Sequence, residues 1–190
     1  MSLLIYMISM SLDGFVADNA GNFDWGAPND EEFSFINDSL RPVGTFLFGR
    51  RLYETMEVWE TMEPPKGSPM HDFAEIWHSA EKIVFSTTLE AATTGKTQIA
   101  RSFDAHTVAT LKRESDRDIC IGGPNLAATA FKLGLIDECR IRLCPVVIGS
   151  GNSAFANDRF VRLELLDQRR FSSGATSLRY RVTPEPVPSR

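Results

Sequence analysis

The chain has 190 residues, of which 43% are hydrophobic and 24% charged, the proportions of a globular protein with one sizeable core. The formal net charge is −5 and the lysines and arginines are scattered, which argues against a surface that binds nucleic acid. The apolar stretch 1–10 is too short to span a bilayer, and no basic segment precedes it. We therefore expect a first core strand there, and neither a signal peptide nor a membrane partner.

The three cysteines, Cys120, Cys139 and Cys144, lie in apolar runs and lack Cys-x-x-Cys spacing. This pattern is typical of small buried side chains in a reducing compartment, and we expect a cytoplasmic protein. The three histidines form no cluster with cysteines or carboxylates. The sequence therefore predicts no metal site.

Short apolar runs alternate with helix-like stretches along the chain, which is typical of a sheet covered by helices on both faces. The expected strands cover residues 3–10, 45–48, 82–85, 97–100, 118–121 and 138–148. Two further strands, 160–166 and 177–182, flank the turn-forming Ser172-Ser173-Gly174 and are predicted to pair as a hairpin. The pattern predicts an α/β fold with a mixed, mainly parallel sheet.

Capping residues and prolines predict where the helices begin. The expected helices are 29–40, a short one after residue 50, one that begins at Ser68-Pro69, one over 104–113 and one over 124–133. No repeat or linker divides the chain, so we expect one domain over 1–183 and a loose tail over 184–190.

The most informative segment is 119–126, in which an apolar run leads through Gly122 and Gly123 into a predicted helix. Glycine lets the backbone turn sharply and approach a ligand, and the free N–H groups at a helix start favour a phosphate. The full fingerprint Gly-x-Gly-x-x-Gly is absent. A tight turn without a ligand therefore stays open as the alternative.

Two other strands end in groups that suit a phosphate. Gly49 is followed by Arg50 and Arg51, whose guanidinium groups suit a phosphate monoester, and Ser86 and Thr87 follow the next strand. The alternatives are a solvated arginine pair and hydroxyls that cap a turn. Because ligands gather at the carboxyl ends of strands in open α/β sheets, we expect these strand ends to converge with the Gly-Gly turn.

Four short motifs thus occur at strand ends: Asp13-Gly14-x-x-Ala17, Gly49-Arg50, Ser86 and Gly122-Gly123. Their order and spacing resemble the dihydrofolate reductase-like superfamily, and within it the reductase C-terminal domains of riboflavin biosynthesis and their stand-alone relatives. The resemblance runs from Leu4 to Val182. It implies a dihydrofolate reductase-like three-layer fold and an NADPH-dependent reductase of a pyrimidine- or pterin-like molecule, similar to 5-amino-6-(5-phosphoribosylamino)uracil reductase.

The resemblance also implies where the cofactor binds. The backbone of Ala17 would meet the nicotinamide carboxamide, and Ser86, with Thr87 beside it, would lie near the 2′-phosphate. The other positions implied for NADPH are Gly49, Arg50 and Arg51 for the adenosine-side phosphates, and Ile121, Gly122, Gly123, Pro124, Asn125 and Leu126 for the pyrophosphate.

The segment Trp25-x-x-Pro28-x-Asp30 matches the part of dihydrofolate reductases that supplies the active-site carboxylate. The resemblance implies that Trp25 and Asp30 contact the substrate and that Asp30 is catalytic, because a carboxylate beside a π-system can manage the proton that accompanies hydride addition. The alternatives are a first-turn aspartate that stabilises a helix dipole and a core tryptophan. Gly149 is a further candidate for a substrate contact, or part of a bare turn.

Three residues depart from the family patterns. Leu52 stands where dihydrofolate reductases have threonine, Thr87 where they often have arginine, and Ile121 where riboflavin-pathway reductases often have glutamate. The preference for NADPH over NADH and the pathway step therefore stay open. A pterin or folate reductase and a non-catalytic nucleotide-binding module are the alternative functions. Because members of this family commonly dimerise, the resemblance also implies a homodimer.

Overall fold

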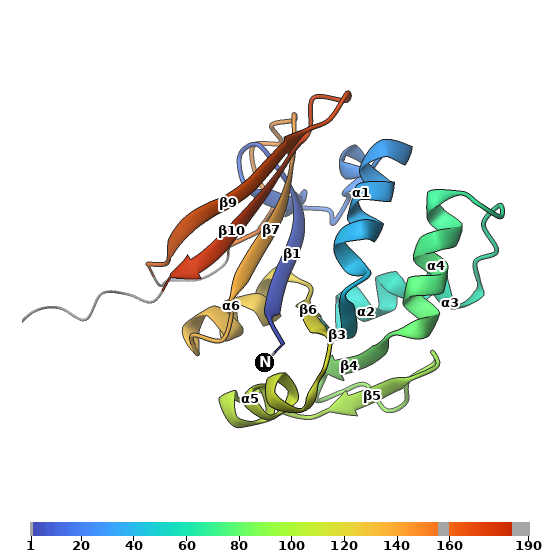
Figure 1. Cartoon of the computed structure of the whole chain (residues 1–190), viewed down its shortest axis with the longest axis vertical. Coiled ribbons are helices and arrows are strands. Elements are labelled where there is room, and N and C mark those ends of the chain that lie inside the picture. The colour runs from blue at the N-terminus through green and yellow to red at the C-terminus, as the bar shows by residue number, and fades with distance from the viewer. Residues whose placement is uncertain (1, 156–159, 184–190) are drawn as a thin grey trace, which may run out of the picture.

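The computed structural model describes residues 2–155 and 160–183. Its main sheet has eight strands in the order β5-β4-β3-β6-β1-β7-β10-β9. Neighbours from β5 to β7 are parallel, and β10 and β9 complete the sheet as an antiparallel hairpin (Figure 1). The strands are β1 (Leu4–Ser11), β3 (Val43–Gly49), β4 (Glu81–Phe85), β5 (Thr97–Ala100), β6 (Asp118–Ile121), β7 (Glu138–Cys144), β9 (Arg162–Arg170) and β10 (Thr176–Thr183). The predicted mixed sheet with its C-terminal hairpin is confirmed.

Helices cover both faces of this sheet, and each face has its own core. One core receives side chains from α1 (Asp30–Leu40), α2 (Arg50–Met56) and α4 (Pro69–Ser79), and the other from α5 (Ala105–Glu114) and α6 (Pro124–Lys132). Within β6, Ile119 and Ile121 join the second core whereas Cys120 joins the first, because successive side chains of a strand point to opposite faces. The result is a three-layer α/β fold.

Two predicted strand boundaries were wrong. β7 ends at Cys144 rather than at 148, because Pro145 has no N–H to continue the ladder. β9 runs from Arg162 to Arg170 rather than over 160–166. The C-terminal part of β9 is polar and has no apolar alternation. It still pairs with β10, because β9 is an edge strand and the backbone hydrogen bonds along its one paired side hold it in the sheet.

Four small elements have no counterpart among the predicted ones. The short sheet of β2 (Phe15–Ala17) and β8 (Asn152–Ser153) joins the loop after β1 to the loop after β7. The other two are the 3₁₀ helix η1 (Asp24–Gly26) and α3 (Val58–Thr61). The expected tail, 184–190, lies outside the described residues, and among those that are described no helix has the length and apolarity needed to cross a membrane.

All three cysteines are buried free thiols, as their apolar surroundings predicted. Burial raises the pKa of the Cys120 thiol to about 12. Burial, together with the nearby Glu138 carboxylate, also raises the pKa of the Cys139 thiol to about 12. Thiolate formation is therefore strongly disfavoured in the native protein.

Candidate functional site

The three predicted phosphate-binding strand ends lie at one edge of the sheet. Gly49 pairs with Phe85 across β3 and β4, which places Ser86 beside it. Leu47 pairs with Ile121 across β3 and β6, and the Gly122 N–H donates to the Leu47 carbonyl at 3.0 Å. The strand order therefore brings together three segments that are far apart in sequence.

The turn between β6 and α6 leaves little space beside Gly122 and requires a positive φ at Gly123. A Cβ on Gly122 would lie 2.6 Å from Cδ2 of Leu52, and Gly123 has a φ of +86°, which L side chains rarely adopt. The side chain of Ile121 is fully buried in the core, so only its backbone is available to a ligand. Leu52, the departure from threonine, packs directly over this turn.

The first turn of α6 has no side-chain cap. Within the described residues, Asn29, Ser68 and Asp104 accept hydrogen bonds from the first turns of α1, α4 and α5, whereas Gly123 provides no such side chain for α6. Asn125 in this first turn is exposed. Uncapped N–H groups at a helix start form a site for an anion.

Two arginines lie on either side of the turn that follows β4. Arg50 donates from Nε to Glu54 at 2.7 Å and from Nη1 to Thr88 Oγ1 at 2.9 Å. Arg101 directly follows β5 and donates from Nη1 to the backbone oxygens of Ser86 and Leu89, at 2.9 and 2.6 Å. Arg101 was not among the candidates named from the sequence, although its position directly after an expected strand was a usable signal.

The hydroxyl of Ser86 has a local structural role in the same turn. Its Oγ accepts from the backbone N–H groups of Thr88 and Leu89, at 3.2 and 3.0 Å. This is the turn-capping alternative that the sequence left open for Ser86. Thr87 and Arg51 are exposed at the same edge.

The loop after β1 is tied to the loop after β7. The Asp13 carboxylate accepts from the N–H of Gly149 at 2.7 Å and from the N–H of Ile148 at 3.2 Å. The Ser11 hydroxyl, and then these backbone donors, lower the pKa of Asp13. The N–H of Gly149 is therefore already bonded to a carboxylate, while Ala17, in β2, pairs with Asn152.

Trp25 and Asp30 lie at the entrance to α1 and differ in their surroundings. Trp25 is in η1, and its buried Nε1 has no hydrogen-bond partner among the described residues. Asp30 is the first residue of α1 and is exposed. Asn29 caps this helix by accepting from the Glu32 N–H at 3.0 Å.

A buried ion pair, which sequence reasoning missed, lies next to these residues. Arg142 on β7 donates from Nη1 to the Glu32 carboxylate, and the two side chains are only 8% and 3% exposed. It also donates from Nη2 to the Gly26 backbone oxygen and from Nε to Ser9 Oγ at 3.1 Å. No local pattern signals a pair whose members are 110 positions apart.

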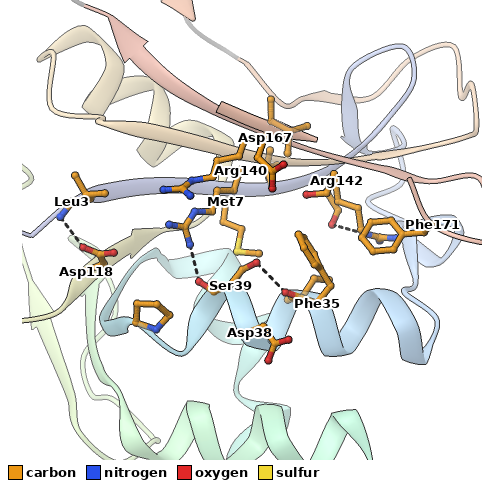
Figure 2. Close-up of a pocket in the computed structure, with 17 residues that line it drawn as sticks. Leu3, Met7, Phe35, Asp38, Ser39, Asp118, Arg140, Arg142, Asp167 and Phe171 are labelled. Carbon is orange, nitrogen blue, oxygen red and sulfur yellow. Dashed lines mark hydrogen bonds between the residues drawn. The ribbon is translucent and has the colours of Figure 1, made fainter. Parts of the chain in front are cut away.

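A cleft of about 550 Å³ separates α1 from β7 and β10, and Arg142 forms part of its wall (Figure 2). Arg140 donates across it to the Ser39 backbone oxygen at 2.7 Å, as the dashed line in Figure 2 indicates. Burial opposes ionisation of Glu138, but hydrogen bonds from Arg179 and Arg140 outweigh it and lower the pKa of that carboxyl. The guanidinium groups of this cleft are thus already paired with carboxylates.

Comparison with known proteins is consistent with this geometry. The model of the RibD C-terminal domain matches residues 2–177. The uncharacterized protein YyaP of Bacillus subtilis (strain 168) is 31% identical over an alignment of 182 residues that covers 93% of this chain and 93% of that one.

Two solved structures share the fold. A putative riboflavin biosynthesis protein from Shewanella sp. PV-4 superimposes with a TM-score of 0.76 at 20% identity, over 96% of this chain and 99% of that one. Dihydrofolate reductase from Enterococcus faecalis, complexed with NADP(H), gives a TM-score of 0.65 at 13% identity, over 96% of this chain and 97% of that one. The chain therefore belongs to the RibD C-terminal domain family, a family of reductases, and has the dihydrofolate reductase-like fold.

Proposed function

We propose that this protein is a reductase that uses NADPH to transfer a hydride to a pyrimidine- or pterin-like small molecule. The observation that supports this most strongly is the convergence of Gly49, Ser86 and Gly122 at the carboxyl edge of the parallel strands. In open α/β sheets this edge is where nucleotides bind. The nicotinamide, when bound, supplies the hydride, and the protein supplies orientation and electrostatics.

The edge fits the phosphates of a dinucleotide. The uncapped first turn of α6, with Gly123, Pro124, Asn125 and Leu126, offers N–H groups and a positive dipole end to a pyrophosphate. Arg50 and Arg51 lie across the edge, and Arg101 extends the positive charge along the turn that holds Ser86 and Thr87. Positive groups on this side suit the extra 2′-phosphate that distinguishes NADPH from NADH.

The substrate would lie toward the entrance of α1, where Trp25 and Asp30 are found. The buried Trp25 Nε1 is an unpaired donor that a heterocycle oxygen or a bridging water would satisfy, and its desolvation otherwise costs about 1–3 kcal/mol. Asp30 is the carboxylate that would orient a water or hold a proton near the reacting atom. Ile121 stands where riboflavin-pathway reductases often have a glutamate that engages the ribityl part of their substrate, and its side chain is aliphatic and buried, so we favour a substrate without that part.

NADPH binding and turnover test this function in two steps. Fluorescence titration of the purified chain with NADPH should saturate at micromolar to low millimolar concentrations, and NADPH oxidation should be detected across a panel of pterins and aminopyrimidines. Turnover that disappears in Asp30→Asn while NADPH still binds would support the catalytic carboxylate. Absence of NADPH and NADH binding at millimolar concentrations would overturn the proposal, and binding without turnover would favour the non-catalytic module.

Two further expectations belong to this proposal. We expect a homodimer because the family relatives dimerise, and light scattering at two protein concentrations tests this. The buried free thiols suit a reducing compartment, which is the basis for expecting a cytoplasmic location.

A further inference from the structure

One guanidinium group joins three segments that surround the candidate substrate site. Arg142, on β7, contacts Ser9 on β1, the backbone of Gly26 in η1 and the carboxylate of Glu32 in α1. These partners lie 133, 116 and 110 positions away in the sequence. The three contacts use Nε and both terminal nitrogens of the planar fork, so the orientation of the group is fully determined.

The partners of Arg142 are direct neighbours of the residues that should meet the substrate. Gly26 follows Trp25, and Glu32 lies two positions after Asp30, within the first turn of α1. A shift of the guanidinium would therefore move both ends of the segment 25–32. Because the pair is almost completely buried, removal of one partner leaves the other charge desolvated, and the local backbone must open to rehydrate it.

We propose that Arg142 is a positioning residue for the substrate side of the site: through Gly26 and Glu32 it fixes Trp25 and Asp30 relative to β1. This inference rests on the proposed reductase function for its effect on turnover. The positioning itself is a property of the free protein. It can therefore be measured whether or not a substrate is known.

The chain contains a matched control two positions earlier on the same strand. Arg140 also forms a part-buried ion pair, with Glu138 at 3.2 Å, and also donates to a backbone oxygen of α1, that of Ser39. Its contact is at the far end of the helix, remote from Trp25 and Asp30 in the sequence. Arg140→Met should therefore lower stability without loosening the segment 22–30.

Hydrogen–deuterium exchange of the free protein is the first measurement. In Arg142→Met, amides such as Gly26 N and Ala27 N, which are bonded to Phe23 and Asp24 oxygens, should exchange about tenfold faster or more than in the wild type. In Arg142→Lys, the point charge still faces Glu32 but cannot make all three bonds. For this variant we expect a free energy of unfolding near that of the wild type, together with faster exchange over 22–30. A purely structural ion pair would not produce this combination.

Kinetics with the panel compound that the wild type reduces fastest are the second measurement. Arg142→Lys should lower kcat/KM by up to about 100-fold, as expected for a reacting group displaced by about 1 Å. The Kd for NADPH should change by less than about twofold, because the phosphate-binding strand ends belong to β3, β4 and β6. Arg140→Met should leave both values near those of the wild type.

The outcomes separate this inference from the proposed function. If the wild type neither binds NADPH nor turns over any compound, the function fails, while the exchange data still decide whether Arg142 fixes the segment. If exchange over 22–30 is unchanged in both Arg142 variants, or rises equally in Arg140→Met, the positioning role is overturned. If exchange rises and the wild-type kcat/KM is retained, the segment does not position the substrate, and the inference is also overturned.

Discussion

The two sides of the candidate site are built in different ways. On the side formed by β3, β4 and β6, a ligand would meet backbone groups, two glycines and exposed arginines, and the start of α6 carries no side-chain cap. On the side formed by β1, β7 and α1, a buried ion pair and its hydrogen bonds fix the surrounding segments. The first side thus presents helix N–H groups that no side chain caps, whereas on the second side Arg142 and Glu32 neutralise each other.

This difference explains why candidate residues on the first side were easier to predict from the sequence than those on the second. Backbone recognition needs glycine at defined places, so its signal is local and appears as short motifs at strand ends. Side-chain recognition by Arg142 and Glu32 depends on a contact between distant segments, which leaves no local pattern. Local motifs accordingly named many candidate residues for the proposed cofactor side, whereas for the proposed substrate side they named only Trp25, Asp30 and Gly149.

The largest expected effect is a loss of stability on the side formed by β1, β7 and α1. Glu32→Ala leaves the Arg142 guanidinium buried and unpaired, and should lower the free energy of unfolding by about 3–5 kcal/mol. Urea denaturation followed by circular dichroism measures this loss. Glu31, the neighbour of Glu32, bonds Arg169 and Ser172 at the surface, so Glu31→Ala should lower the free energy of unfolding far less than Glu32→Ala. Equal losses in the two variants would contradict the comparison.

The next largest effect is a loss of NADPH affinity on the side formed by β3, β4 and β6. Gly123→Ala strains a backbone with φ of +86°, which costs about 1–3 kcal/mol, and relief of that strain would displace the turn. The Kd for NADPH should rise about tenfold or more, as measured by fluorescence titration. Gly174→Ala provides the control, because Gly174 has a φ of +90° but lies in the β9–β10 hairpin. It should lose similar stability and keep its NADPH affinity.

A smaller effect should distinguish the two nicotinamide cofactors. Arg50→Gln removes a cation beside the proposed 2′-phosphate site and should raise the Kd for NADPH about fivefold, while the Kd for NADH stays within about twofold. Parallel titrations with both cofactors measure this ratio. Arg113→Gln, an exposed position on α5, is the control. An equal loss for NADPH and NADH would show that Arg50 does not contact the extra phosphate.

The smallest effect concerns the pH dependence of the loop contact. The pKa of Asp13 is lowered in the folded state by the Ser11 hydroxyl and by the N–H groups of Gly149 and Ile148. Its contribution to stability is therefore complete above the unfolded value of about 4 and is lost as pH falls through the folded pKa. The stability difference between wild type and Asp13→Asn should shrink below pH 4 in acid titrations followed by fluorescence. A difference that is constant with pH would exclude this linkage.

Most of the fold followed from periodicity and capping, because strands such as β6 and helices such as α1 carry strong local signals. The errors have physical causes. β2 and β8 are only three and two residues long and exist because the Asp13 and Gly149 loops meet, which no local propensity encodes. The position of Arg101 directly after β5 was a usable signal, but its contact with the turn at Ser86 depends on the pairing of β5 with β4, and sheet order is a tertiary property.

The buried thiols give the protein an internal reporter of its own opening. With pKa values of about 12, Cys120 and Cys139 are almost entirely protonated at neutral pH and inaccessible in the native state. An alkylating reagent will therefore modify them only in molecules that have opened transiently. The two cores can be followed separately, because Cys120 belongs to the core beneath α1 and α4, and Cys139 to the one beneath α6. The rate at which each thiol becomes labelled then reports whether the two layers separate together or in sequence.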